Sequence, residues 1–316
     1  MRKKTTLAPK GKFAQLTLDF PFKKTFASEG DEDILIALLN AFLERKLAHP
    51  ITQVVIQNPY IQGQTKASRD AHLDIRCKDS EGNRFIVEMQ TGRQKHFFKR
   101  AVYYSSMAIS GGGKKGEGWD FNFPNVYSLN FLDYDIDFGE GNNNIVQYFS
   151  FSDDEYPEIK QNCMNLVFVK LAKFKKSLKE CESFRDRLLY SLCHAHEMDC
   201  KPEQFVESLF DRLFEIARIS NFTSEEVSKY EASFMTRWDY NASMEFAKEE
   251  GFALGEARGV AIGRNEGIAL GEARGVAIGE TKGVLRTARQ MKAKGLNIAL
   301  VAEITGLSEA EIKGLD

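Results

Sequence analysis

Two acidic residues and a glutamine share the polar face of a predicted β-hairpin. The segments AHLDIRCK (71–78) and RFIVEMQ (84–90) alternate apolar and polar residues, and DSEGN between them is typical of a hairpin loop. Successive side chains of a strand point to opposite faces, so Asp74, Glu88 and Gln90 project from the side opposite the apolar residues. Carboxylate oxygens bind hard divalent cations, so the chemistry that these residues indicate is that of a cation held by two acids.

The register of the hairpin decides whether the two acids meet. A hairpin that closes symmetrically about Glu81 pairs Arg76 with Ile86, and the same register places Asp74 opposite Glu88. Directly opposed Cβ atoms lie about 4.5–5.5 Å apart, a distance at which two carboxylates repel. Either one acid stays protonated or a positive charge lies between them, and a divalent cation resolves the conflict best. The alternative is a pair of solvent-exposed acids on an edge hairpin, which alternation alone does not exclude.

The elements around the hairpin predict an α/β domain. Apolar residues recur with helical spacing over 34–43, after Asp31 as a helix cap, and again over about 95–109. Extended segments are expected at 51–61, 125–132, 145–151 and 166–171, in addition to the hairpin. The resulting order over the first 175 or so residues is helix, three strands, helix, three strands, which is typical of a mixed sheet flanked by helices.

Several segments in this order resemble the Rpn family of recombination-promoting nucleases, also labelled transposases. They are LDFPFKKTF, ILIALLNAFL, HLDIRCKDSEGNRFIVEMQ, FFKRAVYYSS and the closing VAEITGLSEAEI. The resemblance spans nearly the whole chain and is most specific where EMQ is followed by FFKRAVYY. It implies the PD-(D/E)XK nuclease fold.

The resemblance also implies a set of site residues. Asp74 and Glu88 correspond to the metal ligands, and the carbonyl of Met89 to a third ligand. Gln90 stands where the wider fold class has a catalytic lysine; a neutral amide orients a water molecule but does not offset negative charge. The implied cofactor is Mg²⁺, with Mn²⁺ or Ca²⁺ as substitutes, because Mg²⁺ takes few protein carboxylates and completes its shell with water and phosphate oxygens.

The missing positive charge is expected from a neighbouring helix. We expect Lys99 to supply it, with Arg100 and Lys23 as alternatives, and Glu32 or Asp33 as an additional acid for the metal. Lys99 and Arg100 can equally be a solvated helix face.

DNA binding has to depend on local basic clusters, because the formal net charge of the chain is only -2. The residues expected to contact phosphates are Lys23, Arg93, Lys95, Arg100, Lys114 and Lys115. The nuclease region has no base-reading motif, so little sequence preference is expected. The expected activity is Mg²⁺-dependent endonuclease cleavage of DNA, which the resemblance links to recombination or mobile DNA. The alternative is a catalytically inactive nuclease-fold protein that binds DNA or assembles.

Cysteine usage and hydropathy indicate a cytoplasmic protein. Five cysteines is an odd count for a disulfide framework, and neither a secretory signal nor a membrane span is recognisable, so no membrane partner is expected. Cys193, His196 and Cys200 fit one face of a helix, but a zinc site there lacks a fourth ligand.

The C-terminal third has its own pattern. A glycine recurs at every fourth position over 251–283, nine times in all. Each glycine costs up to ~1 kcal/mol relative to alanine in a helix, so we expect a long helix that is marginal alone and firmer in a homo-oligomer; a flexible linker is the alternative. The segment VAEITGLSEAEI then resembles a helix-turn-helix core in which Ser308 and Glu311 form a capping box. Its glutamates favour association over reading of a DNA groove.

Four regions follow from these patterns. They are a nuclease domain (1–175), a helical extension (176–250), the glycine repeat (251–283) and a small C-terminal hairpin (284–316). We expect self-association through the last two.

Overall fold

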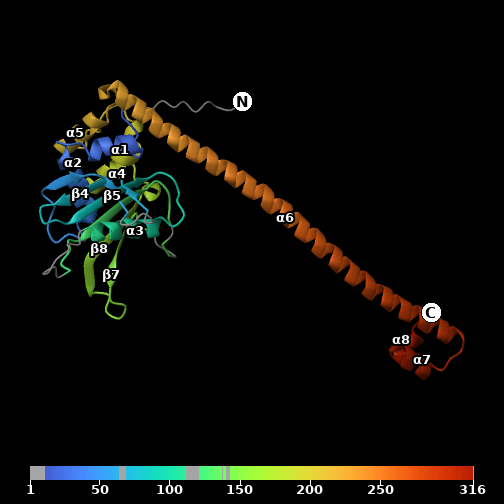
Figure 1. The fold of residues 1–316 in the computed structure, drawn as a ribbon. Helices are drawn as coiled ribbons and strands as arrows, with labels where there is room; N and C mark the ends of the chain where they lie inside the picture. Colours follow the sequence, from blue (N-terminus) through green and yellow to red (C-terminus); the bar gives the residue numbers. More distant parts are fainter. Residues whose placement is uncertain (1–10, 64–68, 112–120, 137, 140–142, 316) are drawn as a thin grey trace. The chain divides into compact units, whose positions relative to one another are not determined.

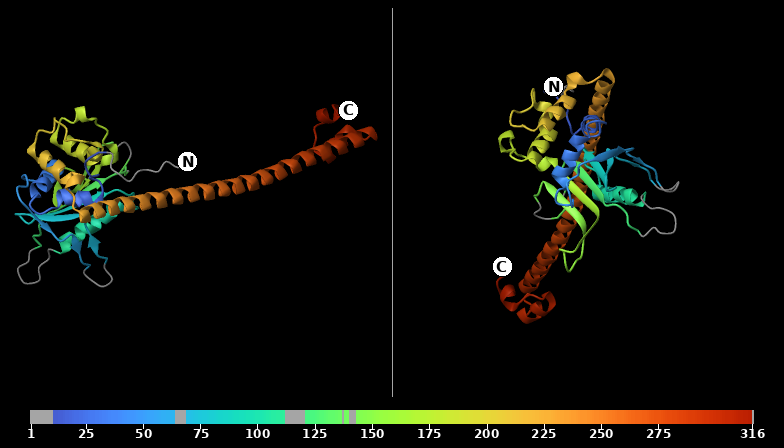
Figure 2. Two further views of the ribbon diagram at one scale, coloured as in Figure 1. Left: turned by 90° about the horizontal axis from the view of Figure 1, so that it is seen from above. Right: turned by 90° about the vertical axis from the view of Figure 1, so that its left-hand side faces the viewer.

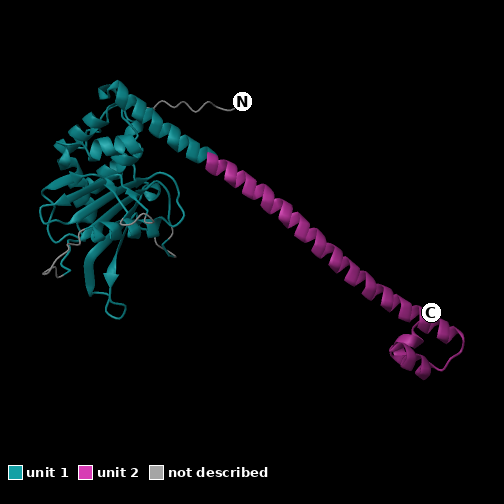
Figure 3. Ribbon diagram, viewed as in Figure 1, with its two compact units in different colours: residues 1–242 teal, residues 243–316 magenta. Residues whose placement is uncertain are grey.

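The computed structural model of the chain describes residues 11–63, 69–111, 121–136, 138–139 and 143–315. The chain forms two compact units, Met1–Ala242 and Ser243–Asp316 (Figure 3). The first unit contains the sheet and most of the helices. The long helix α6 (Ser224–Ala293) begins in the first unit and continues in the second.

A six-stranded mixed sheet forms the centre of the first unit (Figure 1). Its order is β1 (Val54–Gln57), β4 (Ile75–Asp79), β5 (Arg84–Gln90), β6 (Val126–Leu132), β8 (Lys160–Lys170) and β7 (Val146–Ser152). Strands β5, β6 and β8 are parallel, and the other neighbours are antiparallel. A second, two-stranded sheet pairs β2 (Tyr60–Ile61) with β3 (Ala71–His72). Every residue of β6 is buried, because helices cover both faces of the main sheet.

Helices lie on both sides of the sheet (Figure 2). One face carries α1 (Asp19–Phe26), α2 (Glu32–Leu43), α4 (Phe184–His194) and α5 (Ser208–Ala217), and the other carries α3 (Phe97–Ser110). Short 3₁₀ turns occupy Leu171–Lys173, Leu178–Glu180, Ala195–Glu197 and Ile219–Asn221. This arrangement confirms the predicted α/β class with a mixed sheet flanked by helices.

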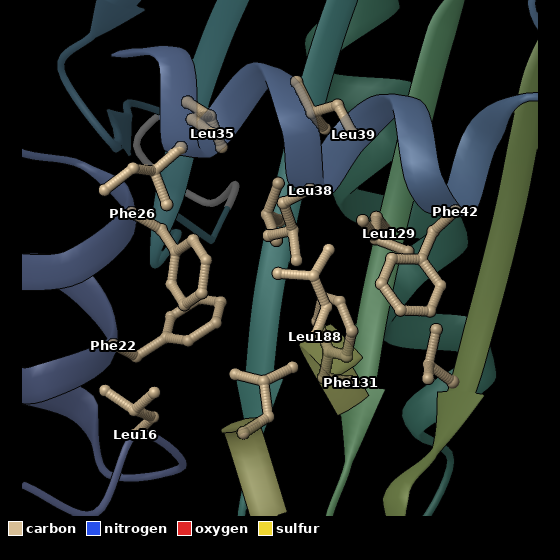
Figure 4. Close-up of a cluster of buried hydrophobic side chains, with 14 of the residues drawn as sticks. Leu16, Phe22, Phe26, Leu35, Leu38, Leu39, Phe42, Leu129, Phe131 and Leu188 are labelled. Atoms are coloured by element: carbon tan, nitrogen blue, oxygen red, sulfur yellow. The ribbon is translucent and has the colours of Figure 1, made fainter. Parts of the chain in front are cut away.

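The larger core joins the sheet to the helices before and after it (Figure 4). Phe42 of α2 and Phe131 of β6 meet edge to face, with ring centroids 5.2 Å apart. Leu188 of α4 and Phe210 of α5 belong to the same buried cluster. The helices that follow residue 175 are therefore built into the same unit as the sheet. The boundary expected at that residue does not separate two cores.

Two features near the chain start differ from expectation. The segment DFPFKKTF forms helix α1, whose apolar side buries Phe22 and Phe26, whereas no element was expected there. Asp31 stands at the predicted N-cap position of α2, but its side chain makes no capping hydrogen bond. Its carboxylate pairs with Arg212 of α5, because α5 packs beside the start of α2.

The single strand predicted over 71–78 is interrupted. Residues 73 and 74 lie outside strands, so that β3 pairs with β2 while β4 pairs with β1 and β5. The predicted register of the hairpin is confirmed, because Arg76 pairs with Ile86. The interruption turns Leu73 to the cluster around Ile86, on the α3 side of the sheet. This side of the sheet was expected to be polar. Helix α3 covers it, and Ile86 is 1% exposed.

The glycine repeat is helical. Helix α6 runs through 70 residues without a break, and the repeat lies inside it, which favours the predicted helix over the linker. For each of the nine glycines, an added Cβ atom would meet nothing within 4 Å among the described residues. Large apolar side chains alternate with them and are more than half exposed: Phe252, Leu254, Val260, Ile262, Ile268, Leu270, Val276 and Ile278.

The chain ends in a small helical module. Helices α7 (Ile298–Thr305) and α8 (Glu309–Lys313) pack with the end of α6 around Ala288, Val301 and Ile312. The predicted capping box is confirmed, because Ser308 Oγ accepts the Glu311 N–H and the Glu311 carboxylate accepts the Ser308 N–H. No helix in the described ranges is both long enough and apolar enough to cross a membrane.

Candidate active site

The two acids of the hairpin are linked through each other's backbone. Asp74 Oδ2 accepts the Met89 N–H at 2.8 Å, and Glu88 Oε1 accepts the Asp74 N–H at 3.3 Å. The interruption of the strand makes this possible, because the Asp74 amide bonds to a side chain instead of a neighbouring strand. The acids predicted to meet across the hairpin therefore do meet.

Burial sets the protonation of this pair. Glu88 is 3% exposed, and burial together with the charge of Asp74 raises its pKa to about 8. Burial also raises the pKa of Asp74, against the opposing effects of the Met89 N–H and Lys23. At neutral pH, Glu88 therefore tends to hold a proton, which is one of the two resolutions of the repulsion that the sequence indicated.

A basic side chain faces Asp74 from α1. Lys23 Nζ lies 3.4 Å from Asp74 Oδ1 and 2.6 Å from Asp19 Oδ1. Burial acts to lower the pKa of Lys23, but the hydrogen bond to Asp19 and the charges of both acids raise it overall. Asp19 is a site residue that the sequence reasoning missed. Its spacing of four from Lys23, which places both on one helix face, was the available signal.

The cation next to Glu88 is Arg100 of α3. Its Nη2 atom lies 3.2 Å from Glu88 Oε2 and 3.2 Å from Gln90 Oε1. The guanidinium also lies over the rings of Phe97 and Tyr104. Lys99, expected to supply this charge, is exposed on the same helix. The geometry therefore favours Arg100 over Lys99 for this role.

Gln90 is held at both ends of its amide. Its Oε1 accepts from Arg100, and its Nε2 donates to the Gly92 carbonyl at 3.3 Å. Gly92 belongs to the loop between β5 and α3 and is buried. The position that carries a lysine in the wider fold class thus has a neutral amide beside a fixed arginine.

The other predicted site residues lie outside this cluster. Hydrogen bonds from its own backbone N–H and from the Gly30 N–H, the latter at 3.1 Å, lower the pKa of the half-buried Glu32 carboxyl, and Asp33 is exposed on the same helix. Arg93 and Lys95 are exposed in the loop after β5. Lys114 and Lys115 lie outside the described residues.

The zinc alternative is not supported. Helix α4 ends at His194, so Cys193, His196 and Cys200 do not share a helical face. Among the described residues, no group of three His, Cys, Asp or Glu side chains is placed to hold a metal ion. The donor set at the hairpin is smaller, namely the carboxylates of Asp74 and Glu88. This set still fits Mg²⁺, which needs only one or two protein carboxylates when phosphate and water complete its shell.

Comparison with known families matches two parts of the chain. The family model described as PD-(D/E)XK nuclease family transposase matches residues 16–247, which include every residue of the cluster above. The model described as the Rpn/YhgA-like nuclease family, C-terminal HTH domain, matches residues 281–316. Neither the search of curated proteins nor that of solved structures gave a match.

Proposed function

Because the chain belongs to the PD-(D/E)XK nuclease family transposases, we propose that it is a metal-dependent endonuclease. In this proposal it hydrolyses phosphodiester bonds of DNA with low sequence specificity, in recombination or the movement of DNA. The observation that carries the proposal is the backbone-linked pair of Asp74 and Glu88, with Gln90 and Arg100 beside it. A buried acid in contact with a half-buried acid lowers stability by charge repulsion, and such perturbed pairs cluster at functional sites.

Each residue of the cluster has a role in this proposal. Asp74 and Glu88 would hold Mg²⁺, with Mn²⁺ or Ca²⁺ as substitutes and the Met89 carbonyl as a further ligand. A bound Mg²⁺ supplies polarisation of the scissile phosphate and a water molecule of lowered pKa. Gln90 orients the attacking water. Arg100 places a positive charge beside Gln90, where charge develops in the transition state.

DNA contacts are proposed for both units. The exposed Arg93 and Lys95 lie three and five residues after Gln90 and would neutralise phosphates near the site. The second contact is the C-terminal module, since the matching family model is named for a helix-turn-helix domain. Sequence preference from the first unit should be slight, because it offers side chains to the backbone of DNA and not to base edges.

Self-association through the repeat of α6 is a further part of the proposal. The open glycines leave room for another backbone, and the exposed apolar side chains between them would be removed from water by a partner helix, which favours association. Four residues turn a helix by about 400°, so successive glycines are offset by about 40°, and a partner helix has to wind with them. Sedimentation measured over a range of concentrations tests this; a monomer at every concentration would remove it.

The second candidate is an inactive nuclease fold that binds DNA or assembles. It is favoured by the observation that each acid already has a basic partner, Lys23 for Asp74 and Arg100 for Glu88, and that position 90 lacks a lysine. This candidate predicts DNA retention that is independent of Mg²⁺ and no products at any metal concentration.

Nicking of supercoiled plasmid separates the two candidates, because one cut per molecule is visible. We expect wild type to nick in Mg²⁺ and not in EDTA, and Asp74→Ala to bind DNA without cutting it. If the double variant Asp74→Ala, Glu88→Ala cuts as wild type does, the site assignment is wrong.

A further inference from the structure

The first turns of α6 belong to the first unit and turn one helical face to the rest of it. Five residues of this face make polar side-chain contacts, and they follow one another at spacings of four, three, four and three: Glu226, Tyr230, Ser233, Arg237 and Tyr240. This spacing places all of them on a single stripe of an α-helix. The family match, which ends at residue 247, takes in this stripe and leaves out the glycine repeat.

The stripe begins on the helix that carries the lysine of the site. Glu226 forms an ion pair with Lys24, and Ser233 Oγ accepts the Phe20 N–H at 3.3 Å. Both partners belong to α1, and they flank Lys23, which faces Asp74. One end of the stripe therefore fixes the element that contributes one of the two cations.

The stripe ends on the loop that holds the glutamine. A Cβ atom added at Gly92 would lie 2.8 Å from Cε1 and Cζ of Tyr240, so the aromatic ring closes directly over this residue. The Tyr240 hydroxyl donates to the Arg93 carbonyl. The carbonyl of the same Gly92 is the acceptor for Gln90 Nε2.

A second link leads from the same stripe to Gln90. Arg237 pairs with Asp133 at the end of β6, and the Asp133 N–H donates to the Gln90 carbonyl at 3.0 Å. The backbone of Gln90 and its side-chain amide are thus both supported by groups that α6 holds. Arg100 contacts the opposite end of the same amide, through Gln90 Oε1.

We propose that Tyr240 is a positioning residue for the nuclease reaction: by closing over Gly92 it fixes the carbonyl that orients the side-chain amide of Gln90. This inference rests on the proposed nuclease function and names a residue of the long helix as part of the support of the active site. Glycine is required at position 92 because the ring occupies the space of a side chain. Tyr240 has no contact with substrate in this role; it acts through the loop.

Three variants and a control test the role by plasmid nicking under single-turnover conditions. Tyr240→Ala removes the ring, and we expect the rate of the cutting step to fall about tenfold, as for loss of an outer support of a ligand, with DNA affinity unchanged. Tyr240→Phe keeps the ring over Gly92 and should stay within about threefold of wild type. Adding Tyr240→Ala to Gln90→Ala should cost nothing further, because residues that act as one unit are not additive.

The matched control is Trp238→Ala. Trp238 is an aromatic residue of the same helix, two positions away, and is 58% exposed. It should cut as wild type does. Thermal unfolding of every variant checks that the first unit remains folded, and hydrogen exchange at the amides of residues 91–94 should be faster in Tyr240→Ala than in Trp238→Ala.

The outcomes separate this inference from the nuclease proposal. Equal cutting rates for Tyr240→Ala and Trp238→Ala would overturn the inference and leave the nuclease intact. So would a full tenfold loss when Tyr240→Ala is placed on the Gln90→Ala background. A wild-type chain that never cuts, with exchange still faster in Tyr240→Ala, would overturn the nuclease proposal and retain Tyr240 as the residue that holds the loop.

Discussion

Gly92 and the glycines of the repeat show how differently the same residue is used in the two units. An added methyl group at Gly92 would lie 2.8 Å from the ring of Tyr240, whereas at Gly267, as at the other repeat glycines, it would meet nothing within 4 Å. In the site loop, glycine is required because another side chain occupies the space. In the repeat, each glycine lowers the stability of the helix unless another molecule packs against it.

The acids and bases of the two units differ in the same way. Asp74, Glu88, Lys23 and Arg100 hold one another within 3.5 Å and are at least partly buried. Glu256 and Arg258 of the repeat are exposed. Burying a charged side chain in a network lowers stability unless its partners are present, and removing one partner leaves the others unsatisfied. A charged side chain on a solvated helix contributes little to stability. Substitutions matched between the two regions therefore test whether function resides in the network.

The largest contrast is expected between Asp74→Ala and Glu256→Ala. Loss of a metal ligand should lower the nicking rate about 100- to 1000-fold, because the charge stabilisation that the metal supplies is worth several kcal/mol. The repeat variant should cut at the wild-type rate. Nicking time courses in Mg²⁺ measure both variants. An Asp74→Ala variant that cuts at the wild-type rate would show that the site acid matters no more than the repeat acid.

The stability of the metal-free protein should depend on pH through Glu88. Its folded-state pKa is raised from the ordinary 4.5 to about 8, so the folded chain holds a proton that the unfolded chain releases. The contribution is present below about pH 4.5 and is lost as pH rises through 8, which lowers the free energy of unfolding by up to a few kcal/mol. Chemical denaturation in EDTA at pH 5, 7 and 8.5 measures the trend.

Glu88→Gln serves as the control for this pH dependence, because the amide does not titrate; the trend should flatten. In wild type, Mg²⁺ should reverse the loss of stability with rising pH, because the cation favours the deprotonated pair and its binding should release protons. A wild-type trend equal to that of Glu88→Gln would show that another group titrates.

Arg100 and Lys99 are adjacent basic residues of α3. Arg100 is half-buried and contacts the site, whereas Lys99 is exposed. Arg100→Ala should lower the cutting rate about 10- to 100-fold, because it removes the cation beside Glu88 and Gln90. Lys99→Ala should stay within about twofold. If the order were reversed, Lys99 would be the catalytic cation that the sequence first indicated, and nicking assays at saturating DNA decide between them.

The smallest contrast compares the two glycines. In the monomer, Gly267→Ala should stabilise the helix by about 0.5–1 kcal/mol, because alanine is the better helix former and no atom of the described chain opposes it. Gly92→Ala should destabilise the first unit by about 1–3 kcal/mol, because the ring of Tyr240 has to move. Thermal melts followed by circular dichroism measure both. A neutral Gly92→Ala would mean that the loop yields easily, and the support from Tyr240 would be weak.

Local pattern was sufficient for several elements and for the pairing of the acids. The alternation of the hairpin segments and the loop between them predicted the register, and the helical spacing of apolar residues predicted α2 and α3. Helix α1 was not predicted because its eight residues include a proline, and its single apolar stripe of two turns is too short to show a helical period. The break in the strand at Asp74 was not predicted because apolar and polar residues continue to alternate through it.

By itself, the sequence determined which residues are acidic, which amide stands in the place of a lysine, and that a two-residue period brings Asp74 to Glu88. Only the tertiary structure decided that Arg100 and not Lys99 contacts the pair, that Asp19 and Lys23 face it, and that Tyr240 covers the loop. The physical reason is range. Strand alternation and helix spacing are set between near neighbours, whereas these contacts join residues that are adjacent only after the helices have packed on the sheet.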